Sequence, residues 1–398
     1  MKPNLHHFVL AACLGATTCS AAETPAAALL VLNKGDNTLA IVDPVVAKVI
    51  ARLPSGPDPH EVVASKGLAF ISNYGGNNTL SVVDLVAQKA LTPINLGALR
   101  SPHGLWVAEG KVYFTAEANK IIGRYDPAAQ QIDWLLGLGQ ERTHMIVVSP
   151  DAKRIYTSNV NSDTISLVER GSGPGGPGGG PGPSGPPGQG SPGGPPPDGA
   201  PPGAPPGAPN AGGLAPSGAD GQAGPSRPPG AGRGSGGPPP FGPPGGGDSS
   251  ATHVAVGKAP EGFDVSPDGK KVWAANSHDG TVSIIDVAKK SVVETLKAGP
   301  RMANRLKFTP DGKFVLISDL GGRDLVVLDT GARKEFKRIA LGGGAAGILM
   351  QPDGAKAYVA SGNGVTVIDL KTMETAGHIE TGPGPDGLGW AIQEPQSH

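Results

Sequence analysis

The chain has 398 residues, of which 33 are basic and 34 acidic, so its net charge of −1 gives no electrostatic basis for binding nucleic acid or an anionic membrane. Glycine and proline are unusually abundant, with 63 and 42 residues, and 54 of these fall within residues 171–250. That stretch has no strict Gly-X-Y period, so collagen is excluded. The rest, about 300 residues, is long enough to bury a large core in one domain.

The N-terminus has the features of an export signal. A basic start at Lys2 leads into a short apolar run over residues 8–16, and Ser20-Ala21-Ala22 fits the small-residue pattern of a cleavage site. The apolar run is too short to span a bilayer. We therefore expect residues 1–22 to be a signal peptide and the mature protein to be periplasmic or secreted.

The two cysteines, Cys13 and Cys19, both lie in this N-terminal segment. Leu10-Ala11-Ala12-Cys13 resembles a lipobox, which leaves a lipid anchor on Cys13 open as an alternative. If cleavage follows Ala22, the mature chain has no cysteine at all. Disulfide bonds, thiolate catalysis and Cys-ligated zinc are then excluded.

The body of the chain repeats itself, with turn strings such as Ser266-Pro-Asp-Gly269 between β-rich runs. The third run of each unit ends in an acidic residue that we expect to cap the following turn: Asp43, Asp84, Asp126, Glu169, Asp286, Asp329 and Asp369. Most of these acids are 40 to 43 residues apart, but one interval is 117 residues long. The excess is about 75 residues, the size of the Gly/Pro-rich segment, so the sequence predicts seven repeats with the fourth interrupted.

Each unit offers four short strands, which is the composition of a β-propeller blade. The first and last units are incomplete in complementary ways. The mature chain begins with a second strand, Ala28–Leu32, and ends with an unpaired first strand, Gly387–Ile392. Pairing these two strands would complete one blade and remove an exposed sheet edge. The sequence therefore predicts that residues 23–398 form an all-β, seven-bladed propeller closed by its two chain ends.

Several of the repeats resemble a known family. Lys271-Val-Trp-Ala-Ala-Asn276, Thr281-Val-Ser-Ile-Ile-Asp286 and Val292–Leu296 resemble the YVTN-type β-propeller repeat, and so does Lys153–Asn159. The resemblance covers nearly all of the mature chain outside the Gly/Pro-rich segment. It implies a propeller of the kind found in lactonase-like and surface-layer proteins, and it leaves the function open.

One unit is closer to a different propeller. Lys111–Glu117 and Ile122–Asp126, behind Pro102-His103-Gly104, are similar to the repeat of streptogramin lyases. The other units do not follow this variant closely.

The first residue of each innermost strand should lie at one mouth of the central channel. The seven equivalent positions are His60, His103, His144, Glu261, Asn304, Ala346 and Asp386. Three of the seven histidines that follow the signal peptide thus occupy equivalent places on three consecutive repeats. Because the repeats are related by rotation about the channel, we expect these imidazoles to converge.

Three converging imidazoles with a carboxylate are a typical ligand set for zinc or another divalent metal that keeps an open position. Candidate ligands are His60, His103, His144, Glu261 and Asp386, and Glu261 is also a candidate general base beside a metal-bound water. The alternative is a polar mouth whose side chains bond neighbouring loops and hold no metal. We expect Asn304, together with His278 and Tyr74 from the loops between second and third strands, to lie on the rim.

The Gly/Pro-rich segment, 171–250, contains only two large apolar residues, Leu214 and Phe241. We expect it to stay disordered, with polyproline character, because it cannot bury a core. It lies between a third and a fourth strand, and such connections are on the propeller face opposite the mouth. It is therefore expected to act as a spacer or as a tether to a polymer or partner.

Three functions are compatible with these features, and the generic repeats, together with the absence of a catalytic signature, favour the first. The first is an exported, monomeric binding module that holds a small ligand or a protein partner at the channel mouth. The second is a metal-dependent lyase or hydrolase that uses the three histidines. The third is a tetrapyrrole-binding propeller, as in periplasmic nitrite-reductase relatives, with a histidine of the mouth as axial ligand. No phosphate-binding loop or nucleophile elbow supports another enzyme class.

Overall fold

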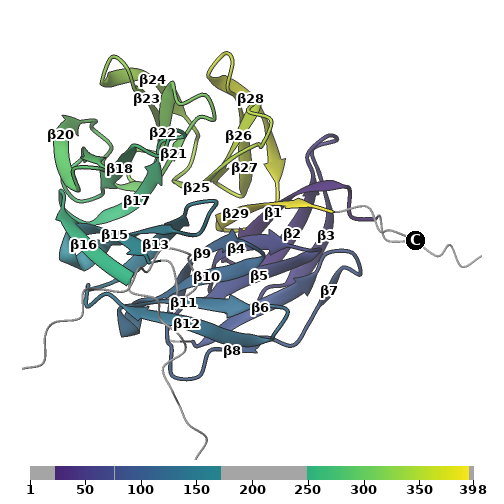
Figure 1. Cartoon of the computed structure of the whole chain (residues 1–398). Coiled ribbons are helices and arrows are strands. Elements are labelled where there is room, and N and C mark those ends of the chain that lie inside the picture. Colours follow the sequence, from purple (N-terminus) through teal and green to yellow (C-terminus); the bar gives the residue numbers. More distant parts are fainter. Residues whose placement is uncertain (1–22, 76, 172–248, 394–398) are drawn as a thin grey trace, which may run out of the picture. The chain divides into compact units, whose positions relative to one another are not determined.

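The structure, a computed structural model, describes residues 23–75, 77–171 and 249–393. The predicted signal peptide and all but the ends of the predicted Gly/Pro-rich insert lie outside these residues. The described chain is nearly all β, and it forms seven four-stranded antiparallel blades in a ring (Figure 1), which confirms the predicted seven-bladed propeller. Within the described residues, no helix is long and apolar enough to cross a membrane.

Blades are numbered in chain order, and each is given from its inner to its outer strand. Blade 1 comprises β29 (Pro385–Ile392), β1 (Ala27–Asn33), β2 (Thr38–Asp43) and β3 (Lys48–Pro54). Blade 2 comprises β4 (Pro59–Ser65), β5 (Leu68–Asn73), β6 (Thr79–Asp84), β7 (Lys89–Ala90) and β8 (Ile94–Asn95). Blade 3 comprises β9 (Pro102–Ala108), β10 (Lys111–Ala116), β11 (Ile121–Asp126) and β12 (Gln131–Gly137). Blade 4 comprises β13 (Thr143–Val148), β14 (Arg154–Asn159), β15 (Thr164–Arg170) and β16 (Ser249–Ala255).

The last three blades follow the same order. Blade 5 comprises β17 (Pro260–Val265), β18 (Lys271–Asn276), β19 (Thr281–Asp286) and β20 (Ser291–Lys297). Blade 6 comprises β21 (Ala303–Phe308), β22 (Phe314–Asp319), β23 (Asp324–Asp329) and β24 (Lys334–Ala340). Blade 7 comprises β25 (Ala345–Met350), β26 (Lys356–Ser361), β27 (Gly364–Asp369) and β28 (Glu374–Glu380). Two 3₁₀ turns, η1 (Glu117–Asn119) and η2 (Val160–Ser162), follow the second strands of blades 3 and 4.

Blade 2 departs from the regular pattern at its outer edge. The fourth strand is split into β7 and β8, which pair separately with β6. Pro93 lies between the two pieces, and a proline has no N–H with which to continue the ladder. The split is confined to the outer strand, so the inner strands that surround the channel are unaffected.

The chain ends close the ring as predicted. β1 and β29 pair antiparallel, with Ala28 opposite Ala391 and Val31 opposite Leu388, and the two strands lie side by side in Figure 1. Blade 1 is thus built from both ends of the chain, and β29 supplies its inner strand.

An asparagine at the end of the second strand ties the repeat together. In blade 5, Asn276 Nδ2 donates to Thr281 Oγ1 at 2.8 Å and to Ser283 Oγ at 3.0 Å. Blades 2 and 4 have the same three-residue network. The Nδ2 donors of these buried amides are thereby satisfied and help to fix the loop that follows, whereas Oδ1 of Asn73 and of Asn276 has no hydrogen-bond partner among the described residues. This network accounts for the asparagine that ends the Val-Trp-Ala-Ala-Asn and Ile-Tyr-Thr-Ser-Asn strings.

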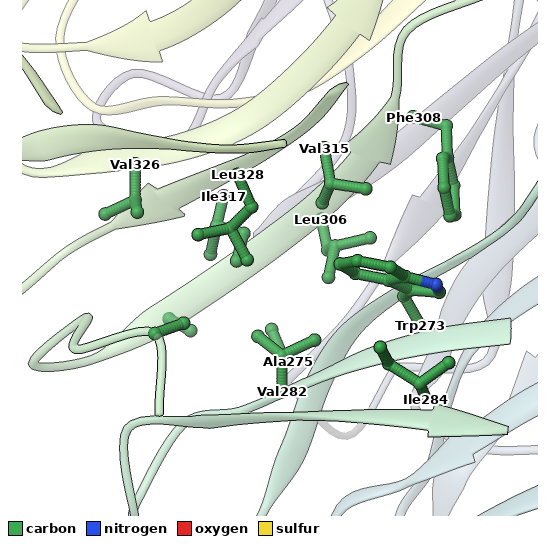
Figure 2. Packing of buried hydrophobic residues seen from close by; sticks show 12 residues of the cluster. Trp273, Ala275, Val282, Ile284, Leu306, Phe308, Val315, Ile317, Val326 and Leu328 are labelled. Atoms are coloured by element: carbon green, nitrogen blue, oxygen red, sulfur yellow. The ribbon is translucent and has the colours of Figure 1, made fainter. Parts of the chain in front are cut away.

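Apolar side chains of adjacent blades form the core. Between blades 5 and 6, Trp273 packs edge to face on Phe308, with ring centroids 5.7 Å apart (Figure 2). Ile284 of blade 5 and Leu306 and Val315 of blade 6 belong to the same buried cluster. Burying such side chains stabilises the fold by about 1.5–3 kcal/mol each. The cores therefore lie between the blades, and the channel is left to the inner strands.

The inner strands approach one another closely near the mouth. Four of them carry glycine directly after the mouth position, and an added Cβ would lie 2.1–2.6 Å from a backbone oxygen of the next inner strand at Gly104, Gly262, Gly347 and Gly387. Any larger side chain would therefore push the strands apart. This close packing brings the mouth residues of neighbouring blades together. Further along the channel is a mostly apolar cavity of about 520 Å³, with walls from all seven inner strands.

The Gly/Pro-rich insert joins β15 and β16, two strands that pair directly with each other. β15 and β16 are in register over seven residue pairs, with Arg170 opposite Ser249 at the end of the ladder. Deleting residues 172–248 and joining the strands by a short glycine-containing turn should therefore leave a folded protein, because the closure entropy of a connection changes only slowly with its length. Thermal unfolding should show a midpoint within a few degrees of the full chain. A loss of more than about 2 kcal/mol in unfolding free energy would contradict this expectation.

Candidate metal centre

The three predicted histidines meet at the channel mouth. His60, His103 and His144 are each the second residue, not the first as expected, of the inner strands β4, β9 and β13 of consecutive blades. The ring centroids of His103 and His144 are 3.8 Å apart, and those of His60 and His103 are 4.7 Å apart. The rings are therefore gathered over one point of the mouth, as their equivalent repeat positions predicted.

A buried carboxylate that the sequence analysis did not single out joins this group. His103, Glu117 and His144 each offer a ligand atom, and these atoms all lie within 4.8 Å of one another. Their exposed fractions are 2%, 7% and 1%, so all three are buried. Glu117 comes from η1, directly after β10. A repeat alignment contains its signal, because Glu117 follows the second strand of blade 3 just as Tyr74 follows that of blade 2.

Glu117 and Glu261 hold His144 from its two sides. His144 Nδ1 hydrogen-bonds Glu117 Oε1, and Tyr74 donates its hydroxyl to Glu117 Oε2 at 2.7 Å. On the other side of the ring, Glu261 Oε2 lies 2.8 Å from His144 Nε2, yet this nitrogen has no hydrogen-bond partner in line with it. Arg142 joins the two acids, with Nη1 donating to Glu261 Oε1 at 3.1 Å.

His103 has one nitrogen bound and one without a partner. Its Nε2 lies 3.0 Å from His60 Nδ1, whereas its buried Nδ1 has no hydrogen-bond partner. A buried polar atom without a partner costs about 1–3 kcal/mol and is rare in folded proteins. His103 Nδ1 is therefore the atom at which binding of a ligand would be most favourable.

A second group of charges lies on the side of blades 1 and 2. His60 Nε2 faces Lys34 Nζ at 2.7 Å and Asp58 Oδ1 at 3.2 Å. Asp386, at the start of β29, lies 3.5 Å from Lys34 Nζ and 3.8 Å from His60 Nδ1. Asp386 is thus near the cluster but pairs with Lys34.

An ion pair crosses the channel from blade 6 to blade 2. Arg305 on β21 donates Nη2 to Glu61 Oε1 on β4 at 2.5 Å, and its guanidinium is almost fully buried. Both residues also line the apolar cavity, directly after the mouth positions of their strands. The pair therefore lies between the mouth cluster and the cavity.

The remaining candidates lie at the edge of the site or away from it. Asn304 accepts a hydrogen bond from Arg305 Nη1 at 3.2 Å and is half-buried. His278 is exposed in the loop between β18 and β19, and its backbone N–H donates to Lys258 O at 3.2 Å. Of the predicted rim residues, Tyr74 is the one that contacts the cluster, packing its ring 4.6 Å from that of His60.

The histidines differ in their affinity for protons. Burial lowers the pKa of His60 to about 4, although Asp386 opposes the shift. Burial, with the neighbouring His144 adding to it, also places the pKa of His103 well below its ordinary value. Burial would likewise lower the pKa of His144, but its hydrogen bond to Glu117 and the nearby carboxylate of Glu261 outweigh burial and raise it. Burial would raise the pKa of Glu261, but the adjacent His144 lowers it to about 2, so this acid is ionised near neutrality.

These shifts predict that the metal-free protein loses stability between about pH 6.5 and pH 4. His60 and His103 take up protons more readily when unfolded, so their contribution is complete above pH 6.5 and is lost on acidification. His144, with its raised pKa, changes stability in the opposite direction. For His60, a shift from 6.5 to about 4 corresponds to ~3 kcal/mol.

Urea unfolding in the presence of a chelator, at pH 7 and pH 5, measures this effect. The His60→Asn variant has no proton to take up at this position and should show a smaller difference between the two pH values. An unfolding free energy that is equal at the two pH values, or higher at pH 5, would contradict the assignment.

No protein-family model matches the chain, and no curated protein matches it either. Solved structures do. A functionally unknown protein from Desulfotomaculum acetoxidans DSM 771 aligns with a TM-score of 0.61 at 9% identity, covering 93% of this chain and 99% of that one. Kuenenia stuttgartiensis hydrazine synthase aligns with a TM-score of 0.55 at 17% identity, covering 83% and 88%.

A third structure is the dihydro-heme d1 dehydrogenase NirN in complex with DHE, with a TM-score of 0.52 at 14% identity. The alignment covers 90% of this chain and 64% of that one. At such identities the three likenesses show the propeller fold alone. Membership of the YVTN-type family and the likeness of one blade to streptogramin lyases stay predictions.

Proposed function

We propose that the protein is a ligand-binding propeller whose channel mouth binds one divalent transition-metal ion through His103, His144 and Glu117. The observation that carries this proposal is the buried group of two imidazoles and one carboxylate within 4.8 Å, with His103 Nδ1 left without a partner. Two nitrogens and one oxygen suit zinc and neighbouring metals, and three protein ligands leave a position for water or a further ligand.

The charge of the mouth supports a cation as the ligand. The described mouth groups include three cations, Lys34, Arg142 and Arg305, and five carboxylates. The carboxylates are Asp58, Glu61, Glu117, Glu261 and Asp386. With neutral histidines, two negative charges are therefore in excess, and a divalent ion would balance them. Without metal, a proton on His144 offsets one of the two.

Metal analysis of untagged protein tests the proposal. Protein stripped with a chelator and dialysed against Zn²⁺ should retain about one equivalent per chain in native mass spectrometry. The outer-strand histidines provide a matched control, because His253 bonds Ser166 Oγ at 2.9 Å and does not contact the mouth. His253→Gln should retain the same stoichiometry. If the wild-type protein retains no metal after dialysis, the proposal fails.

A metal-dependent lyase or hydrolase is a second candidate function. It is favoured by Glu261, an ionised carboxylate 2.8 Å from His144 Nε2 that retains partial exposure to the mouth. A carboxylate so placed could accept a proton from a metal-bound water. Dependence of an activity on both the metal and Glu261 would distinguish an enzyme from a binding module.

The tetrapyrrole alternative is supported only by the ligand of NirN, one of the proteins with the same fold. Visible absorbance of the purified protein, before and after addition of a haem, would test it.

Export is also part of the proposal. It is based on the sequence of residues 1–22, which lie outside the described chain. Fractionation of cells, with N-terminal sequencing of the mature protein, would show whether cleavage follows Ala22.

A further inference from the structure

His60 lies between the candidate ligand His103 and two charged side chains at the edge of the mouth. Its Nδ1 is 3.0 Å from His103 Nε2, and its Nε2 faces Asp58 Oδ1 at 3.2 Å and Lys34 Nζ at 2.7 Å. Both imidazole nitrogens of His60 are thus engaged. The Tyr74 ring, 4.6 Å from the His60 ring, packs against it.

We propose that His60 is a positioning residue, which orients His103 toward the metal, and that Asp58 orients His60 in turn. This inference rests on the proposed metal site and deepens it. It differs from the three-imidazole set expected from the repeats, in which His60 is itself a ligand.

The positions of the protons in the hydrogen bonds that link His103, His60 and Asp58 lead to this assignment. A histidine that binds a metal through one nitrogen carries its proton on the other, and that N–H is almost always held by an acceptor. Because His103 Nε2 already faces His60, the partnerless Nδ1 is the nitrogen available to the metal. His103 Nε2–H then donates to His60 Nδ1, and His60 Nε2–H donates to Asp58.

Lys34 favours the opposite arrangement. Its ammonium group can only donate, so His60 Nε2 must accept this bond and the proton of His60 lies on its Nδ1. His60 Nδ1–H then donates to His103 Nε2, and the proton of His103 lies on its own Nδ1, where it blocks the metal. Lys34 Nζ also lies 3.5 Å from both Asp58 and Asp386, so it keeps two charge partners when it releases His60. Asp58 and Lys34 therefore select opposite tautomers of the same two rings.

The experiment compares two His60 variants that differ in one property. Asparagine places an amide oxygen close to the position of Nδ1 and can still accept from His103, whereas leucine cannot. Zn²⁺ affinity is measured by chelator competition in about 0.5 M NaCl, where long-range charge effects are screened. We expect His60→Leu to lower affinity by about 10–100-fold and His60→Asn to stay within a few-fold of wild type.

Lys34 provides an independent test with the opposite sign. Lys34→Met should raise Zn²⁺ affinity several-fold, whereas Lys120→Met, which removes a rim lysine paired with Glu141, should not. An equal change in the two lysine variants would indicate a general charge effect and would overturn the assignment of Lys34.

A spectroscopic signature separates positioning from ligation. The ¹⁵N resonances of His60 should show a proton on Nδ1 in the metal-free protein and on Nε2 after Zn²⁺ is added, and X-ray absorption should count two imidazoles on zinc. Three imidazoles, or equal losses in His60→Leu and His60→Asn, would make His60 a ligand and overturn the inference. Failure of wild-type protein to bind Zn²⁺ would instead refute the proposed function, and the metal-free ¹⁵N spectrum would still test the hydrogen-bond chain.

Discussion

Replacing His144 by glutamine should lower the affinity for Zn²⁺ by more than about 100-fold, because removal of residues that only orient a ligand already costs 10–100-fold. Glutamine is chosen because its amide can still donate toward Glu117 or Glu261, which would otherwise be left as buried carboxylates without their shared partner. Glu117→Gln, which removes the carboxylate and keeps the shape, should have an effect of the same size. Affinity is measured by competition with a chromophoric chelator.

The matched control for this loss is His253→Gln, on β16 at the outer edge of blade 4. It removes an imidazole of the same blade without altering the mouth, and its affinity should equal that of wild type. Circular dichroism and thermal unfolding should show that all three variants remain folded. Binding that survives both His144→Gln and Glu117→Gln would show that zinc is held elsewhere.

The fold was predictable because the repeats encode it many times over. Seven closing acids, recurring turn strings and complementary chain ends each indicate the same closed ring, and the structure confirms the ring and its closure. The six aspartates among these acids cap turns as expected, for example with Asp43 Oδ1 accepting from Val45 N at 2.8 Å. Glu169 instead accepts a hydrogen bond from Lys290 Nζ at 2.7 Å. The split of the outer strand of blade 2 at Pro93 was the kind of local departure that a repeat alignment averages away.

The candidate site was predictable only in part. Equivalent positions placed His60, His103 and His144 on neighbouring strands, so their convergence followed from rotational symmetry. Glu117 was missed because the reasoning followed the first residue of each inner strand, whereas this acid reaches the mouth from the turn after a second strand. Arg305 was missed for another reason: the sequence does not show which side chains extend across a channel between blades that are far apart.

The candidate site therefore results from different side chains at equivalent positions of the inner strands. Each of the seven mouth positions is the second residue of an inner strand, and closely packed glycines follow four of them. Blades 2, 3 and 4 place imidazoles there, blade 5 an acid, and blade 7 the small Ala346. The ligand groups are thus concentrated on one side of the mouth, and this asymmetry gives the ring a single candidate metal centre among the residues that the structure describes.

A chain that ends at Gly384 should fail to fold into a soluble propeller, because it lacks β29, the inner strand of blade 1. The truncation removes the buried Leu388 and Ala391 and leaves the ladder edge of β1 without a partner. Losing such burial and hydrogen bonds costs more than about 5 kcal/mol, comparable with the whole stability of a typical domain. The exposed inner edge is also a template for aggregation.

The measurement is the soluble yield and the cooperativity of thermal unfolding, with a chain that ends at Gln393 as the control that keeps β29. A complementary variant places cysteines at Ala28 and Ala391, which face each other in the β1–β29 ladder. Oxidation should link the two strands and raise the unfolding temperature, because the disulfide would close a loop that spans nearly the whole chain and could add about 4 kcal/mol. A truncated chain that stays soluble and unfolds cooperatively would show that blade 1 does not need its C-terminal strand.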